Sequence, residues 1–160
     1  MNKALQIISI QHELVLSLNT SSEIEQIIKG FLRTCNVRLN LISSHLFLYI
    51  GDDQQPCNKH SCVNGGNIEH FVSVPKQQNG KPYRYSSGLL NCVSSLEKEQ
   101  QSSKKMHAEN LYLFRVKGLG VLALEYRSQP DNILQKILDP ILEKLSLSCT
   151  AAINNKALKN

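Results

Sequence analysis

The C-terminal end of this sequence constrains the fold most, because it combines two short apolar segments, a glycine turn and a long helical pattern. Residues 111–116 and 121–126 are rich in aliphatic and aromatic side chains and flank a turn with two glycines, which predicts an antiparallel hairpin. We expect Gly118 and Gly120 to adopt backbone angles that other residues avoid. Apolar residues then recur at helical spacing over 133–153. This pattern indicates a helix that packs along most of its length, and Pro140 is expected to bend it.

The N-terminal part predicts two helices and a buried strand. Residues 3–18 carry apolar side chains on more than one side, which leaves one surface for a partner. Thr20 and Glu23 have the spacing of a capping box, and residues 24–32 continue with a single apolar stripe, so a second helix is expected there. The run 46–50 is continuously apolar and is bounded by polar residues. Such a run is typical of a strand buried on both faces, and we interpret it as the central strand.

The middle of the chain, residues 52–105, is polar and has only short apolar islands at 68–74 and 89–93. A loop of this length without secondary structure is uncommon in a compact domain, so short strands and helices are expected. Binding sites are often built on such variable segments. No repeat or Pro/Gly-rich linker divides the chain, and residues 1–160 are interpreted as one domain.

Composition and charge narrow the class of protein. The chain has 160 residues, of which 41% are hydrophobic, so it can bury a core. No apolar run is long enough for a membrane span and no secretory signal is present, which favours a cytoplasmic protein without a membrane contact. The net charge of +5 is scattered over the polar middle stretch. A scattered excess of this size does not indicate nucleic-acid binding.

The five cysteines are an odd number and are widely separated, which favours reduced thiols. Cys35 and Cys149 lie in apolar helical patterns, where a free cysteine acts as a small buried hydrophobe. Zinc prefers sulfur and imidazole ligands, and one polar segment offers both. These residues are Cys57, His60, Cys62 and His70. Their irregular spacing favours a polar loop over a metal site, and redox sensing by Cys57 and Cys62 is the other alternative.

The order helix, helix, buried strand, variable middle, hairpin and long helix resembles the GAF family of sensory domains. The resemblance depends on residues 120–125, which look like the family's late glycine-plus-aliphatic strand, and on 133–158, which look like its exit helix. It implies an α+β fold with a central antiparallel sheet, the N- and C-terminal helices on one face and a ligand pocket on the other. It also implies a non-enzymatic part of a longer signalling protein, dimeric through its terminal helices. A histidine kinase of a two-component system or a diguanylate cyclase would be the usual output.

The family's ligand motifs are not matched. Asn58-Lys59 lacks the residues that follow it in cyclic-nucleotide-binding members, and no adjacent Cys-His pair is present for a covalent tetrapyrrole. The cysteines do not reproduce the framework of the methionine-sulfoxide reductases of this fold. The sequence therefore assigns no cofactor.

The pocket and the dimer seam are predicted from aromatic, charged and apolar side chains. The ligand is expected near Phe71, Tyr83, Arg84, Tyr85 and Tyr112. An aromatic pair around a guanidinium suits a planar or anionic ligand, although a strand with Tyr83 and Tyr85 on one side explains the same spacing. The seam is expected to contain Ile8, Val15 and Leu18 with Leu145, Cys149 and Ile153. A PAS-like sensor and a small redox or metal protein remain the alternatives.

Overall fold

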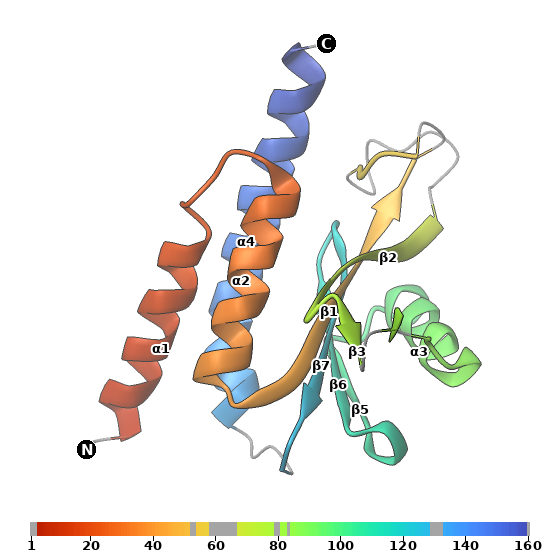
Figure 1. Ribbon diagram of the computed structural model, residues 1–160. Helices are drawn as coiled ribbons and strands as arrows, with labels where there is room; N and C mark the ends of the chain where they lie inside the picture. Colours follow the sequence, from red (N-terminus) through yellow and green to blue (C-terminus); the bar gives the residue numbers. More distant parts are fainter. Residues whose placement is uncertain are drawn as a thin grey trace.

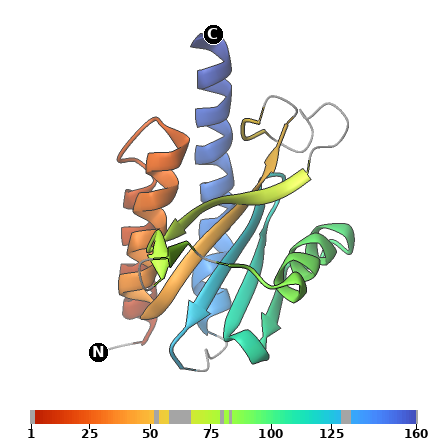
Figure 2. The ribbon, with the colours of Figure 1, turned by 45° about the vertical axis from the view of Figure 1, so that its right-hand side comes forward.

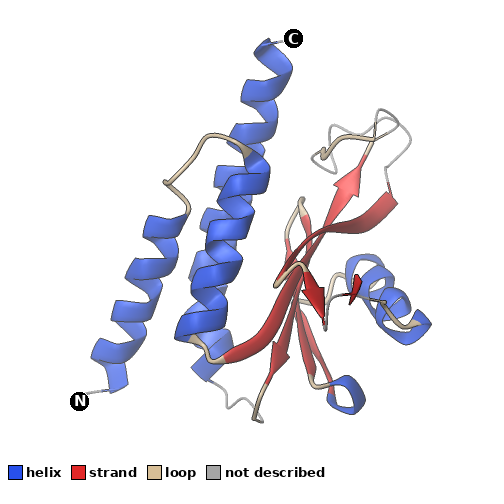
Figure 3. Cartoon of the chain, viewed as in Figure 1, coloured by secondary structure: helices blue, strands red, loops and turns tan. Residues whose placement is uncertain are grey.

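The computed structural model describes residues 3–51, 54–57, 67–78, 81–82, 84–128 and 133–159, and it places one antiparallel sheet between two layers of helices (Figures 1 and 3). The helices are α1 (Lys3–Ser17), α2 (Ile24–Arg38), α3 (Ser87–Lys98), α4 (Ile133–Lys159) and the short 3-10 helix η2 (His107–Glu109). The main sheet contains β1 (Leu41–Ile50), β2 (Asn67–Val74), β5 (Ser103–Met106), β6 (Leu111–Val116) and β7 (Gly120–Tyr126). A separate two-stranded sheet pairs β3 (Gln77–Gln78) with β4 (Lys81–Pro82).

The strand order of the main sheet is β2-β1-β7-β6-β5, and each neighbouring pair is antiparallel. The predicted hairpin is confirmed as β6 and β7. The prediction that 46–50 forms the central strand is wrong in position, because β7 is the middle strand and β1 lies beside it. It is also too short, since β1 begins at Leu41. Asn40 adopts a left-handed φ of 55° and turns the chain from α2 directly into the sheet.

The two glycines of the hairpin have different roles. Gly118 has a φ of 78°, as expected for the turn. Gly120 does not share this conformation, so that prediction is wrong for it. Its requirement is space, because a Cβ at this position would lie 1.8 Å from the carbonyl oxygen of Phe47. The close approach of β7 to β1 therefore depends on a missing side chain.

Helices α1, α2 and α4 cover one face of the sheet, with α1 on the outside against α2 and α4 (Figure 1). Helices α1 and α4 run in the same direction, α2 runs the opposite way, and α4 continues beyond the sheet (Figures 1 and 2). The predicted capping box is wrong. Thr20 Oγ1 donates to the carbonyl of Ser17 at 3.1 Å, and Glu23 takes the cap position of α2 without a side-chain hydrogen bond. The apolar stripe of α2, not its cap, fixes the helix on the core.

Helix α3 covers the opposite face of the sheet (Figure 2). It buries Leu89, Val93 and Leu96 in a second core with side chains of β1, β6 and β7. The ion pair between Glu97 Oε2 and Arg115 Nε, 3.0 Å apart, ties the end of α3 to β6. The expectation of short elements in the polar middle stretch is confirmed, because β2, β3, β4, α3 and part of β5 come from it.

Strand β1 contributes to both cores. Leu46 and Leu48 belong to the core under α2 and α4, whereas Phe47 belongs to the core under α3. This alternation is the normal geometry of a strand buried on both faces. Among the helices of the described residues, none has the length and apolar character needed to cross a membrane.

A buried polar network as the candidate functional site

A connected group of polar side chains lies on the α3 face of the sheet, beside the second core. It consists of Ser43 and His45 of β1, His70 and Ser73 of β2, Glu125 of β7, and Tyr85 from the irregular segment before α3. His45 is 3% exposed and Ser73 is 8% exposed. Buried polar groups are costly unless they are hydrogen-bonded, and here every member has a partner within the network.

The hydrogen bonds define which atoms donate. Ser43 Oγ donates its single proton to Glu125 Oε1 at 2.7 Å. Ser43 Oγ must then accept from Nε2–H of His45, which is 2.9 Å away. The other ring nitrogen of His45, Nδ1, is left as an acceptor for the hydroxyl of Ser73 at 2.6 Å. The network is therefore a directed chain of hydrogen bonds that ends on the carboxylate of Glu125.

Tyr85 covers the buried end of this chain. Its hydroxyl lies 2.7 Å from Ser73 Oγ and 3.1 Å from His45 Nδ1. Its ring packs against three aromatic side chains, with centroids 5.3 Å from Phe47, 5.5 Å from His45 and 5.0 Å from His70. Edge and tilted contacts at these distances are favourable for aromatic pairs. Tyr85 thus packs its ring among aromatic side chains and its hydroxyl against the network, and we call the space that its side chain occupies the slot.

The environment of the slot keeps its imidazoles neutral. Burial, with a smaller contribution from His70, lowers the pKa of His45 to about 4. Partial burial also lowers the pKa of His70, opposed by a hydrogen bond that the imidazole donates to the backbone of Val72. A neutral His45 that donates Nε2–H to Ser43 has Nδ1 available to accept from the hydroxyl of Ser73 or Tyr85.

The hydroxyl of Ser73 next to an imidazole resembles the start of a nucleophilic relay. Two features of the geometry oppose that chemistry. The second nitrogen of His45 bonds Ser43 instead of a carboxylate, and the hydroxyl of Ser73 is buried and already bonded to Tyr85. The arrangement suits recognition of a ligand or of Tyr85 itself better than catalysis.

The residues predicted to form the pocket do not converge. Tyr85 lies in the slot on the α3 face, and Arg84 is exposed next to it. Phe71 and Tyr112 pack on the other face, in the core under the helices. Tyr83 lies outside the described residues. The alternative interpretation of 83–85 as a strand does not hold for Arg84 and Tyr85, which belong to neither a helix nor a strand.

The residues predicted to form the dimer seam also lie in different environments. Leu18, Leu145 and Cys149 are buried in the domain's own core, and Val15 and Ile153 are partly buried against it. Ile8 is exposed. These assignments describe one copy of the chain, so pairing with a second copy stays a prediction.

The cysteines fall into two groups. Cys35 and Cys149 are buried free thiols, as predicted, and burial raises the pKa of both, that of Cys149 to about 12. Cys57 is disulfide-bonded, which corrects the expectation of a fully reduced chain. His60 and Cys62 lie outside the described residues, and within the described part no cluster of metal-ligating side chains occurs. His70 belongs to the polar network.

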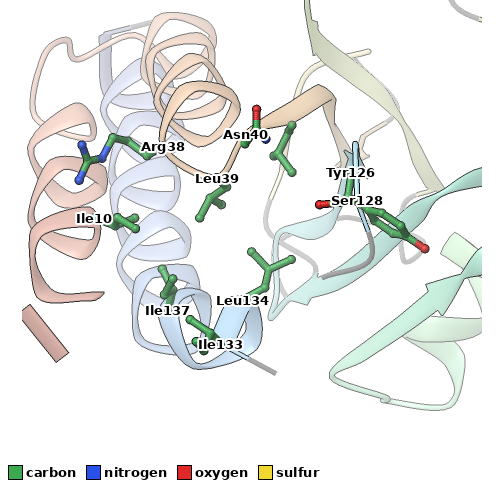
Figure 4. A pocket seen from close by; sticks show the side chains of 10 residues that line it. Ile10, Arg38, Leu39, Asn40, Tyr126, Ser128, Ile133, Leu134 and Ile137 are labelled. Carbon is green, nitrogen blue, oxygen red and sulfur yellow. The ribbon is translucent and has the colours of Figure 1, made fainter. Parts of the chain in front are cut away.

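A second hollow, of about 300 Å³, lies at the base of the helical layer (Figure 4). Leu39, Leu134 and Ile137 line it, and the guanidinium of Arg38 points toward α1 instead of into the space (Figure 4). That guanidinium donates to Ser9 Oγ at 3.3 Å and pairs with Glu13 at 3.5 Å. Asn40, Tyr126 and Ser128 also line the hollow, but its charged group is already bound to α1, and the connected network on the α3 face is the stronger candidate.

Four members of the network were missed by sequence reasoning, namely Ser43, His45, Ser73 and Glu125. The predicted strand covers only 46–50 and is preceded by Ser43 and Ser44, so no face of the sheet is assigned to His45. The available signal was Ser43 and His45 at alternate positions directly before an apolar run. Alternation of this kind places both side chains on one face of a strand.

The similarity of this chain to known proteins is structural and weak. No protein-family model matches the chain, and no curated protein matches it. One similar solved structure is a protein in its far-red absorbing dark state with bound biliverdin IXa, with a TM-score of 0.47 and 11% identity over 89% of this chain and 98% of that chain. At this identity and TM-score, the likeness assigns no ligand to the present chain.

The class of the fold follows from the arrangement itself. A five-stranded antiparallel sheet carries the N- and C-terminal helices on one face, and the second face bears the short helix and the polar network. This confirms the predicted α+β, GAF-like fold class.

Proposed function

We propose that this chain is a non-enzymatic sensory domain whose input site is the slot filled by Tyr85 and whose output runs through α1 and α4. The observation that carries the proposal is the buried, directed network beneath Tyr85. Apolar side chains would stabilise this part of the core at a lower desolvation cost than polar ones do. A fully hydrogen-bonded polar network around one phenol side chain, that of Tyr85, therefore favours a recognition role. The output of a longer chain would be a kinase or cyclase of the kind expected from the sequence.

Strand β1 supports a connection between the input and the helices. His45 lies in the network, and the adjacent Ser44 donates to the carbonyl of Leu32 in α2 at 3.3 Å from the other face. A shift of β1 on one side therefore changes its packing on the other. Binding alters the helices to the extent that the ligand prefers one arrangement of β1.

The chemistry of the slot indicates the ligand class. A small planar ring with a hydroxyl or similar polar group would reproduce the contacts of Tyr85 with Phe47, His70 and Ser73. Such a ligand must displace Tyr85, and the apparent affinity falls by the cost of that displacement. The segment 84–86 can move as a unit only if Ser86 releases Glu109, to which it donates at 2.6 Å.

Removal of the tyrosine ring tests the slot. We expect Tyr85→Ala to bind 4-methylphenol roughly tenfold or more tightly than the unchanged chain does, because the internal competitor is gone. Ligand-observed NMR titration measures both affinities. In Tyr85→Ala, toluene should bind more weakly than 4-methylphenol, since it has no hydroxyl to replace the one that Tyr85 places against Ser73 and His45.

The double variant Tyr85→Ala/Ser73→Ala provides the control for specific recognition. It should lose the preference for the phenol over toluene. Equal affinities in Tyr85→Ala and the unchanged chain, or a preference unaffected by Ser73, would remove the slot as the input site. If 4-methylphenol binds but does not change the hydrogen-exchange rates of α1 or α4, the slot remains a binding site. Signalling through those two helices is then ruled out.

We propose that the predicted homodimer forms through a smaller surface than the predicted seam, namely the exposed side of α1. Leu5 and Ile8 are each 59% exposed and Leu16 is 53% exposed, and they follow one side of α1 together with the exposed His12. Their spacing gives a continuous apolar stripe facing away from α2 and α4. We propose that this stripe pairs with the same stripe of a second copy.

A charge on the stripe tests this pairing. We expect Ile8→Glu to weaken self-association by at least roughly tenfold, because it buries a carboxylate in an apolar seam. Analytical ultracentrifugation over a concentration series gives the dissociation constant. Val37→Glu is the matched control, since Val37 is 78% exposed and lies on α2 outside the stripe. A chain that is monomeric before substitution, or equal effects of both variants, would contradict the proposal.

A further inference from the structure

Pro140 lies inside α4 and disturbs its backbone hydrogen bonds. Proline has no N–H, so the carbonyl of Lys136, four residues earlier, lacks its usual helical donor. The proline ring also crowds that carbonyl and opens the next turn of the helix. Backbone acceptors freed in this way need another partner, either water or a side chain.

Gln11 of α1 supplies that partner. Its side-chain Nε2 donates to the carbonyl of Ile137 at 3.2 Å and lies 3.5 Å from the carbonyl of Lys136. A carboxamide nitrogen carries two hydrogens, so one side chain can address both carbonyls. The contact joins two helices that are far apart in the sequence, at the one turn of α4 that contains a proline.

We infer that Gln11 and Pro140 form a latch: the proline makes the carbonyls of α4 available, and Gln11 uses them to fix the position of α1 along α4. The carbonyl of Lys136 has no α-helical donor in any arrangement of α4, whereas a hydrogen bond from the N–H of Ile141 would compete with Gln11 for the carbonyl of Ile137. The backbone of α4 at this turn and the docking of α1 therefore depend on the same contact. This inference does not depend on the slot or its ligand, because both helices form the contact without them.

The packing around the latch explains why a polar contact matters there. Leu14, one turn after Gln11, is fully buried, and Ile7 and Ile10 are partly buried against the core under the helices. These aliphatic side chains hold α1 to the layer but tolerate sliding, since apolar contacts have little directional preference. Hydrogen bonds to two defined carbonyls select a single register.

A double-mutant cycle between the two positions tests the latch. We expect Gln11→Ala to raise the hydrogen-exchange rates of the α1 amides by roughly three- to tenfold, the effect of losing a net hydrogen bond. In a Pro140→Ala background the same substitution should change those rates by a smaller factor, because residue 140 again donates to the carbonyl of Lys136 and Gln11 keeps only its bond to the carbonyl of Ile137. Native-state hydrogen exchange read by mass spectrometry resolves α1 from the rest of the chain.

Two further variants separate the latch from ordinary packing. Gln6→Ala removes an exposed glutamine of the same helix and should leave the α1 rates unchanged in both backgrounds. Gln11→Glu keeps the shape and replaces the donor with an acceptor, so it should loosen α1 at least as much as Gln11→Ala at neutral pH. Effects of Gln11→Ala that are equal with and without Pro140, or absent in the unchanged chain, would overturn the inference.

Discussion

Gly120→Ala is expected to destabilise the protein by about 3 kcal/mol or more, among the largest effects of a single methyl group. The added Cβ would lie 1.8 Å from the carbonyl oxygen of Phe47 and 2.9 Å from Cα of Leu48. Both are backbone atoms in β1, so relief requires β1 and β7 to move apart. That movement weakens the pairing in the middle of the sheet and disturbs both cores. Chemical denaturation followed by circular dichroism measures the loss.

Gly30→Ala is the matched control for this prediction. Gly30 lies inside α2, and its added Cβ would meet Thr20 Oγ1 at 3.6 Å and the carbonyl of Ser17 at 3.7 Å, which are ordinary contacts. Alanine is the better helix former by about 0.5–1 kcal/mol, so this variant should be more stable than the unchanged chain. A small effect of Gly120→Ala, similar in size to that of Gly30→Ala, would show that β7 does not approach β1 this closely.

The second large effect is a loss of folding stability at acidic pH. His45 has a pKa near 4 in the folded protein, against 6.5 when it is free of these surroundings. Between these values the unfolded chain binds the extra proton and the folded chain does not, so stability rises with pH across the window. We expect His45 to account for the loss of about 3 kcal/mol as the pH falls from 6.5 to 4. Denaturation series at several pH values give the slope.

His45→Gln should flatten this slope, because glutamine keeps polar atoms in the network and does not titrate. His12→Gln, which removes an exposed imidazole of α1, should leave the slope unchanged. His70 acts in the same direction as His45, since partial burial lowers its pKa too. A slope that is the same in the His45 variant and the unchanged chain would show that the network does not hold His45 neutral.

The parts of the fold predicted correctly are those with a strong local pattern. The hairpin around Gly118 and the helical spacing after Ile133 both repeat over many residues, and their packing follows from that repetition. The position of β1 in the sheet was not predictable in this way. Strand order depends on long-range pairing, and the apolar run 46–50 would look the same at any interior position.

The candidate site was harder to predict because its chemistry comes from four separate segments. Tyr85 is predicted from its aromatic ring, but its partner Ser73 and the carboxylate at the end of the network, Glu125, lie on strands and have ordinary sequence surroundings. Tyr112 was selected for the same reason and faces the opposite side of the sheet. Residue type alone does not give the face of a strand, and a β-bulge between Leu46 and Phe47 shifts the register against β2.

Because α4 continues far beyond Pro140, a small change in the helix angle at this residue would move the end of the helix over a larger distance. From Pro140 to the end of the helix at Lys159, an α-helix spans roughly 28 Å at its normal rise per residue. A change of ~10° in the bend at the proline would carry the far end sideways by ~5 Å. The same rotation moves the atoms beside Gln11 by a fraction of that distance. Since Leu145 and Cys149 anchor the first part of this segment in the core, the part of α4 that continues beyond the sheet would be displaced most.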